Sequence, residues 1–248
     1  MPRSARKKSP SGIYHVMLRG INRQSIFIDD EDNIRFLQIL KECKKLSGFE
    51  LYGYCLMGNH IHLLQKETEE STGQIVKRFA SRYVLWFNRK YQRCGHLFQE
   101  RYKSEAVESD AYFASVLRYI HQNPKKAGIC DSIREYRWSS YNEYAGESRI
   151  IDGELALGII GESKFEEFME EEDRSNDIME YVGQKRILTD SELIMEIEDM
   201  IGIKAIMIQN EPRDKAENIC RSILKIEGVS TRQLSRVTGV SKNIIWRL

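Results

Sequence analysis

The sequence predicts an α+β fold: a ferredoxin-like split βαβ sheet with helices, followed by an all-α C-terminal region that ends in a helix-turn-helix. Two observations predict the sheet. Patterns alternate as strand, helix, strand, strand, helix, strand between residues 13 and 107, and polar turns separate them. A third observation predicts the rest, because beyond residue 146 the apolar residues recur at helical spacing. At 248 residues the chain is long enough for one full domain and a smaller one.

The first predicted strand and helix lie near the start of the chain. IYHVMLR, residues 13–19, is rich in β-forming residues. The run DDEDNIRFLQILKECKKL then has helical spacing, and Asp29 or Asp30 can cap that helix by accepting hydrogen bonds from its first N–H groups. Its apolar positions include Ile34, Leu37 and Cys43.

A hairpin and a second helix follow. FELYGYCLM and HIHLLQK read as two strands joined by a tight Gly58–Asn59 turn. TGQIVKRFASRYVLWFNRKY, residues 72–91, then has the period of a long helix. We expect its inward positions to include Ile75, Phe79, Val84 and Trp86.

The fourth strand and last helix complete the predicted domain near residue 146. GHLFQERYKSEAV, residues 95–107, reads as the strand, and AYFASVLRYIHQ as the helix, capped by Ser109 or Asp110. Pro124 is expected to stop this helix, because proline disfavours helical geometry in the residue before it.

Charge is distributed unevenly along the chain, although the formal net charge is only +1. Residues 1–145 carry 24 Lys and Arg against 16 Asp and Glu, residues 146–210 carry 6 against 17, and residues 211–248 carry 8 against 4. We therefore predict a first domain over 1–145, an acidic helical connecting region over 146–210 and a helix-turn-helix domain over 211–248. Two basic parts indicate a polyanionic partner.

The C-terminal stretch VSTRQLSRVTGVSKNIIWRL has a helix-turn-helix pattern. A helix begun at Ser230 or Thr231 ends at Gly239, which permits a tight turn, and Ser241 caps a second helix. The alternative is an ordinary helical hairpin. In the favoured interpretation the second helix presents Lys242, Asn243 and Arg247 to the major groove, and Arg232 and Arg236 lie near phosphates.

Two of the five histidines stand in one predicted strand. Side chains two apart in a strand project to the same side, so His60 and His62 lie about 6.6 Å apart from a rise of ~3.3 Å per residue. Imidazoles so placed can converge on one metal ion. Two hydrogen-bonded polar residues are an equally good interpretation of the pair alone.

The last predicted helix adds a stripe of residues at i, i+4 and i+7 spacing, Tyr112, Val116, Tyr119 and Asn123. Such tyrosines are usually core aromatics, but Asn123 can supply an oxygen ligand beside the two imidazoles. Mg²⁺ and Mn²⁺ accept mixed nitrogen and oxygen ligands and retain waters that a phosphate replaces. A structural zinc ion is the weaker alternative, because no cysteine pair accompanies the histidines.

Four motifs in order, GIYHVMLRGINRQ, GNHIHLL, GHLFQERYKS and RYIHQNPKKAG, resemble the HUH single-tyrosine transposases, specifically the REP-associated tyrosine transposase-like group. The resemblance covers roughly residues 1–145 and implies an HUH nuclease core. It further implies that His60 and His62 bind the metal, that Tyr119 is the nucleophile and that Asn123 completes the metal site. Tyr112 remains the rival nucleophile.

These assignments predict a metal-dependent single-strand DNA endonuclease and strand transferase that acts near hairpins or repeats through a 5′-phosphotyrosine. A repeat-binding regulator that uses the same fold without cutting DNA is the alternative. His121 is interpreted as a surface or phosphate contact, and His15 and His96 receive no role. We expect a cytoplasmic monomer or homodimer that needs no membrane and no small-molecule cofactor.

The predicted partner is single-stranded or hairpin DNA of the REP-like repeat type. Basic residues beside the predicted site and in the N-terminal tail are the expected phosphate contacts. They are Arg3, Arg6, Lys7, Lys8, Arg19, Asn22, Arg23, Arg101, Lys103, Arg118 and Lys125.

Overall fold

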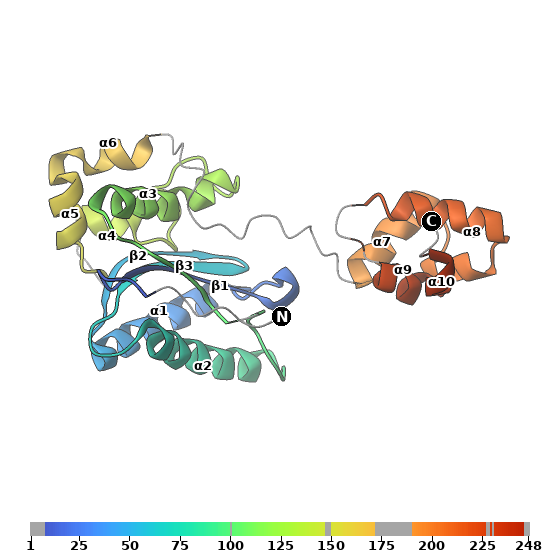
Figure 1. Cartoon of the computed structure of the whole chain (residues 1–248), viewed down its shortest axis with the longest axis horizontal. Coiled ribbons are helices and arrows are strands. Elements are labelled where there is room, and N and C mark those ends of the chain that lie inside the picture. The colour runs from blue at the N-terminus through green and yellow to red at the C-terminus, as the bar shows by residue number, and fades with distance from the viewer. Residues whose placement is uncertain are drawn as a thin grey trace. The chain divides into compact units, whose positions relative to one another are not determined.

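The computed structural model describes residues 8–99, 101–146, 150–171, 190–226, 229 and 231–245. The chain divides into two compact units, Met1–Met179 and Glu180–Leu248. The first unit contains the sheet, and the described part of the second unit is helical (Figure 1). Within the described ranges, no helix combines the length and the apolar character that crossing a bilayer requires.

The described residues of the first unit form an antiparallel sheet in the order β2-β3-β1-β4. Its strands are β1 (Ile13–Arg19), β2 (Glu50–Met57), β3 (His60–Lys66) and β4 (Lys103–Ala106). This order confirms the predicted split βαβ topology. The fourth strand is much shorter than its pattern suggested, and Phe98 joins the sheet edge only through an isolated bridge to Gly20.

Helices α1 (Asp30–Ser47) and α2 (Thr72–Lys90) cover one face of the sheet, and α3 (Asp110–Lys126) covers the other (Figure 1). Asp29 caps α1 as predicted, by accepting a hydrogen bond from the Asp32 amide. Aromatic side chains of α1 and α2, Phe36, Phe79 and Tyr83, pack edge to face beneath the sheet. Ile34 of α1 instead stays 44% exposed.

Helix α3 begins after its Ser109 cap but does not stop at Pro124, so the predicted end was wrong. The helix continues to Lys126, and the next two amides donate to the carbonyls of Asn123 and Lys125. A proline this near the end of a helix removes one backbone N–H donor, but the hydrogen bonds of the next turn still form. The loss of helix stability is therefore small.

The acidic middle of the chain does not form one connecting region, and this differs from the predicted division at 145 and 210. Helices α4 (Tyr141–Ala145), α5 (Glu154–Ile160) and α6 (Phe165–Glu170) belong to the first unit, with the short turns η1 (Ile21–Arg23) and η2 (Glu162–Lys164). Both α5 and α6 pack on α3. Apolar side chains hold α5 and α6 in the first unit, because Ala156, Phe165 and Met169 are buried in the cluster beneath α3.

The second unit is helical and has its own apolar core. It contains α7 (Asp190–Ile201), η3 (Ala205–Asn210), α8 (Arg213–Ile223), α9 (Thr231–Thr238) and α10 (Lys242–Ile245). Leu193, Cys220 and Leu234 are among its buried residues. Gly239, between α9 and α10, has a φ of 72°, which glycine adopts easily, and the helix-turn-helix assignment of these helices stays a prediction. Their role in DNA binding stays a prediction, and the proposed cap Ser230 lies outside the described residues.

Candidate active site

Strand β3 and helix α3 bring three of the predicted site residues together. His60 and His62 project from the same face of β3, and their ring centroids lie 4.9 Å apart. The ring of Tyr119, on α3, lies edge-on 5.6 Å from that of His62. The side chain of Tyr119 is only 3% exposed, because α3 lies flat on the sheet at this point.

A third histidine, His15 of β1, completes the group, although no role was predicted for it from the sequence. Its Nε2 atom lies 3.0 Å from Nδ1 of His62, and the two rings stack with centroids 5.3 Å apart. His15 also meets Tyr119 edge-on at 5.9 Å. The register explains this, because His62 pairs with Met17, and His15 stands two residues away on the same side of β1. Only the pairing of β1 with β3 could have revealed it.

The hydrogen bonds of the two site histidines decide which ring nitrogen each one offers. Nδ1 of His60 lies 2.6 Å from the Asn59 side-chain oxygen, and Nδ1 of His62 is engaged by His15. Nε2 of His62 is buried and has no hydrogen-bond partner among the described residues. Metal-binding histidines are usually held in this way, with one nitrogen bonded to a neighbour and the other turned to the ion.

Burial keeps these imidazoles neutral. It lowers the pKa of His60 to about 4, where the Arg19 guanidinium lowers it further and a hydrogen bond with Asn123 opposes the change. Burial also lowers the pKa of His62 well below its ordinary value, and the neighbouring His60 and His15 add to the effect. A neutral imidazole is the form that binds a metal ion, because the nitrogen lone pair must be free.

Two imidazoles and an amide oxygen are a fitting but incomplete set of ligands. Against the lowering by burial, the Asn123 side chain acts to raise the pKa of His60, so the amide lies close to this ring. Among the described residues, no group of three or more His, Cys, Asp or Glu side chains is arranged to hold a metal ion. An ion held by His60, His62 and Asn123 therefore needs water or substrate oxygens to fill its coordination, which suits Mg²⁺ or Mn²⁺ better than a closed structural zinc site.

A lysine that the sequence reasoning missed lies against the tyrosine. The Lys126 ammonium stands 5.1 Å from the centre of the Tyr119 ring. Its position seven residues after Tyr119 on the same helix was the available signal. The rival Tyr112, one heptad upstream, packs against the apolar cluster beneath α3.

His121 is fully buried, which corrects its interpretation as a surface or phosphate contact. Its Nε2 atom lies 2.8 Å from the Ser140 hydroxyl, and the Ser140 amide donates to the Tyr54 carbonyl of β2. The chain beyond α3 folds back along β2 and covers the side of α3 on which His121 lies. His121 therefore ties α3 to the edge of the sheet.

The loop after β1, which contains Asn22 and Arg23, is hydrogen-bonded to Asn59 beside the site histidines. Asn22 and Arg23 have positive φ values of 51° and 60°, a region that residues other than glycine seldom adopt. The Asn59 amide donates to the Arg23 carbonyl at 3.2 Å, while the Asn59 oxygen bonds His60. One asparagine thus links a strained loop to a predicted metal ligand.

The remaining predicted DNA contacts fall into three groups. Two arginines form ion pairs within their units. Arg118, whose side chain is 12% exposed, bonds Glu171 at 2.9 Å and stacks on the Phe168 ring. Arg236 forms a bidentate pair with Asp190. These ion pairs link each arginine to another part of its own unit, and the role of both as phosphate contacts stays a prediction. Arg3, Arg6, Lys7 and Arg247 lie outside the described residues. Surface positions are occupied by Lys8, Asn22, Arg101, Lys103, Lys125, Arg232, Lys242 and Asn243, with Arg19 and Arg23 partly buried.

Comparisons with known proteins agree with the first unit. Residues 8–123 match the family model described as "Transposase IS200 like". A Haemophilus influenzae protein, whose name places it among the REP-associated tyrosine transposases, is 24% identical over 143 residues that cover 53% of this chain and 80% of that protein. A solved structure of a REP-associated tyrosine transposase bound to a REP hairpin has 15% identity and a TM-score of 0.53, and covers 76% of this chain and all of that one. The fold and the resemblance carried by the four sequence motifs are thereby confirmed.

Proposed function

We propose, from the match of residues 8–123 to the IS200-like transposase model, that this protein cuts and rejoins single-stranded DNA through Tyr119. The single observation that carries the proposal is the packing of the Tyr119 ring against His62, whose Nε2 atom is buried and has no hydrogen-bond partner in the described part of the chain. The solved relative is bound to a hairpin, so we extend the proposal to DNA hairpins of the repeat type.

The proposed reaction exchanges one phosphodiester for another. The Tyr119 oxygen attacks the scissile phosphorus and forms an O–P bond, and the bond from phosphorus to the 3′ oxygen breaks. The phenol loses its proton to solvent, and the departing 3′ oxygen takes one up. The products are a 5′-phosphotyrosine and a free 3′-hydroxyl, and the reverse attack by a 3′-hydroxyl rejoins the strand without ATP.

The residues around the phenol prepare this step. A phenol with an ordinary pKa of ~10 needs about 4 kcal/mol to lose its proton at pH 7. The Lys126 ammonium lies 5.1 Å from the centre of the Tyr119 ring and adds positive charge beside the incoming phosphate. His60, His62 and Asn123 would hold a Mg²⁺ or Mn²⁺ ion that binds a phosphate oxygen and neutralises the charge that develops there. Helix α3 fixes the direction from which the phenol approaches.

The test is a covalent adduct between the protein and a labelled hairpin oligonucleotide in Mn²⁺. We expect Tyr119→Phe to abolish the adduct on a denaturing gel and to leave DNA binding in a gel shift unchanged, because only the nucleophilic oxygen is lost. Tyr112→Phe is the matched control, and it should retain the adduct. An adduct that persists in Tyr119→Phe would reject this nucleophile. A shift without any adduct or shorter strand in the wild-type protein would favour the non-cleaving regulator.

A further inference from the structure

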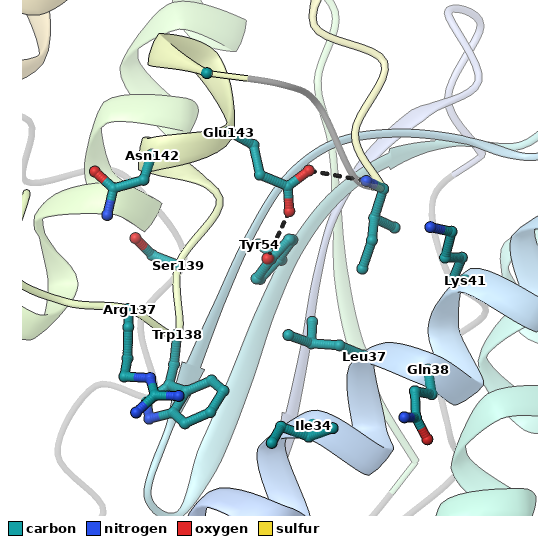
Figure 2. A pocket seen from close by; sticks show the side chains of 12 residues that line it. Ile34, Leu37, Gln38, Lys41, Tyr54, Arg137, Trp138, Ser139, Asn142 and Glu143 are labelled. Carbon is teal, nitrogen blue, oxygen red and sulfur yellow. Dashed lines mark hydrogen bonds between the residues drawn. The ribbon is translucent and has the colours of Figure 1, made fainter.

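A cavity of about 650 Å³ lies beside the outer edge of β2, and its described lining contains no histidine (Figure 2). One wall is α1, and the other is the segment 137–143, which follows β2 as an added edge. The Leu56 amide donates to the Trp138 carbonyl, and the Ser140 amide to the Tyr54 carbonyl, both at 2.9 Å. We propose that this cavity binds an unpaired nucleotide of the DNA substrate, a proposal that rests on the proposed function.

The walls fit the flat face of a base. Trp138 of the edge segment stands opposite Ile34 and Leu37 of α1 (Figure 2). Ile34 is 44% exposed, so this apolar surface is open to a ligand. Stacking on an indole suits any base, because every base has a π-face. The Gln38 amide at the rim can donate to and accept from a base edge.

The charges fit the phosphate that accompanies the base. Lys41 of α1 and Arg137 of the edge segment both line the cavity. The Arg137 guanidinium stacks on the Trp138 ring at 4.4 Å and pairs with Asp30 at 2.9 Å. Both side chains of that pair are more than 60% exposed, so solvent screens it and a phosphate can compete for the arginine.

Among the described residues that line the cavity, Glu143 is the one carboxylate, and both of its oxygens accept hydrogen bonds. One accepts a hydrogen bond from the Tyr54 hydroxyl at 2.7 Å, and the other from the Ile150 amide at 2.8 Å (Figure 2). These donors offset its negative charge and hold it at the far end from Arg137. The end near Arg137 is therefore the positive one.

The position of the cavity suits a strand that leaves the active site. Leu56, which is bonded to Trp138, pairs across the sheet with Ile61, the residue between the two site histidines. Trp138 thus lies two strand spacings from β3, about 10 Å. The histidines face α3 and the indole faces α1, so a single strand must pass around the β2 edge to reach both. Unpaired DNA is flexible enough to turn there, and a duplex is not.

The experiment uses the full chain carrying Tyr119→Phe, so that binding is measured without cleavage. The probe is a hairpin oligonucleotide with a single-stranded extension containing one iododeoxyuridine at each position in turn. We expect Trp138→Leu to weaken binding roughly 5- to 150-fold, the range for loss of one stacked base. Trp86→Leu on α2, away from the cavity, is the matched control and should bind as before. Photocrosslinks should map to the peptide that contains Trp138.

A second variant separates the proposal from a folding defect. Lys41 is an exposed side chain, so Lys41→Ala should fold normally and lower the slope of log Kd against log salt concentration by about 1, the value for one lost phosphate contact. Unchanged affinity in Trp138→Leu, or crosslinks that never reach Trp138, would overturn the nucleotide site while the Tyr119 adduct still upholds the enzyme. Conversely, if Tyr119→Phe retains the adduct, the proposed nucleophile is wrong. The crosslinks to the Trp138 peptide then still decide whether the cavity binds a nucleotide.

Discussion

At the scale of single residues, the hydrogen-bond partner of each imidazole decides which of its ring nitrogens is available to a metal ion. His15 is buried, and its contact with Nδ1 of His62 leaves Nε2 as the only nitrogen that His62 can offer an ion. Asn59 does the same for His60. Loss of His15 or Asn59 should weaken metal binding even if neither residue contacts DNA. A histidine ligand whose orientation is not held by a neighbour binds metal weakly.

Replacing His15 by phenylalanine should therefore lower the affinity for Mn²⁺ by about 10- to 100-fold, the usual effect of losing a residue that orients a ligand. Titration calorimetry with Mn²⁺ alone measures this without any DNA. His96→Phe, at an exposed position, is the control and should bind Mn²⁺ as the wild type does. Equal affinities in the two variants would show that His15 is only a core residue.

His121 makes the stability of the first unit depend on pH. Burial lowers its pKa from 6.5 to about 3, so the folded state resists protonation that the unfolded chain accepts. The stabilisation is complete above pH 6.5 and is lost as pH falls towards 3. The variant His121→Gln keeps a hydrogen-bond donor for Ser140 but has no imidazole to protonate. When the pH falls from 7 to 5, its free energy of unfolding should decrease by about 2 kcal/mol less than that of the wild type. Urea titrations at both pH values check this, and parallel losses would contradict it.

At the scale of elements, the approach of α3 to the sheet decides where Tyr119 lies. Gly53 of β2 makes that approach close, because a Cβ at this position would stand 2.5 Å from a methyl group of Leu117 on α3. The same Cβ would lie within 4 Å of the Ser140 hydroxyl and the His121 ring. A glycine in a central part of a strand thus serves helix packing.

Gly53→Ala should lower the unfolding free energy by about 1 to 3 kcal/mol, the cost of overpacking a close contact. It should also slow adduct formation, since α3 carries the nucleophile. Gly58→Ala, where an added Cβ meets nothing within 4 Å, is the paired control and should leave both quantities near the wild type. Chemical denaturation and a single-turnover adduct assay supply the two readouts. A stable, fully active Gly53→Ala would mean that α3 adjusts without moving Tyr119.

At the scale of the whole molecule, two units with separate cores share one chain. The first holds the sheet and the helices through α6, and the second holds α7 to α10 around its own buried residues. The acidic segment is divided between them. Its first half is anchored by ion pairs such as Arg118 with Glu171 and Arg134 with Glu166, together with apolar contacts to α3.

The two units should fold independently. Fragments 1–179 and 180–248 are each expected to unfold cooperatively on heating, because each buries an apolar cluster of its own. Fragment 1–145 should be less stable than 1–179, since it lacks the α5 and α6 side chains that cover α3. Circular dichroism melts of the three fragments test this. Equal melting of 1–145 and 1–179 would show that α5 and α6 add nothing to the core.

The order of strands and helices could be predicted from the local sequence, as could the caps of α1 and α3 and the common face of His60 and His62. These depend on periodicity and on neighbours a few residues away, which the local sequence records. It could not show that Arg118 binds Glu171 or that Pro124 stays inside α3, and it missed Lys126 beside Tyr119. Tertiary structure alone decided that His15 orients His62 and that Trp138 faces α1 across a cavity. Both need the pairing of strands and edges far apart in the chain, and that pairing is set by how the whole core packs.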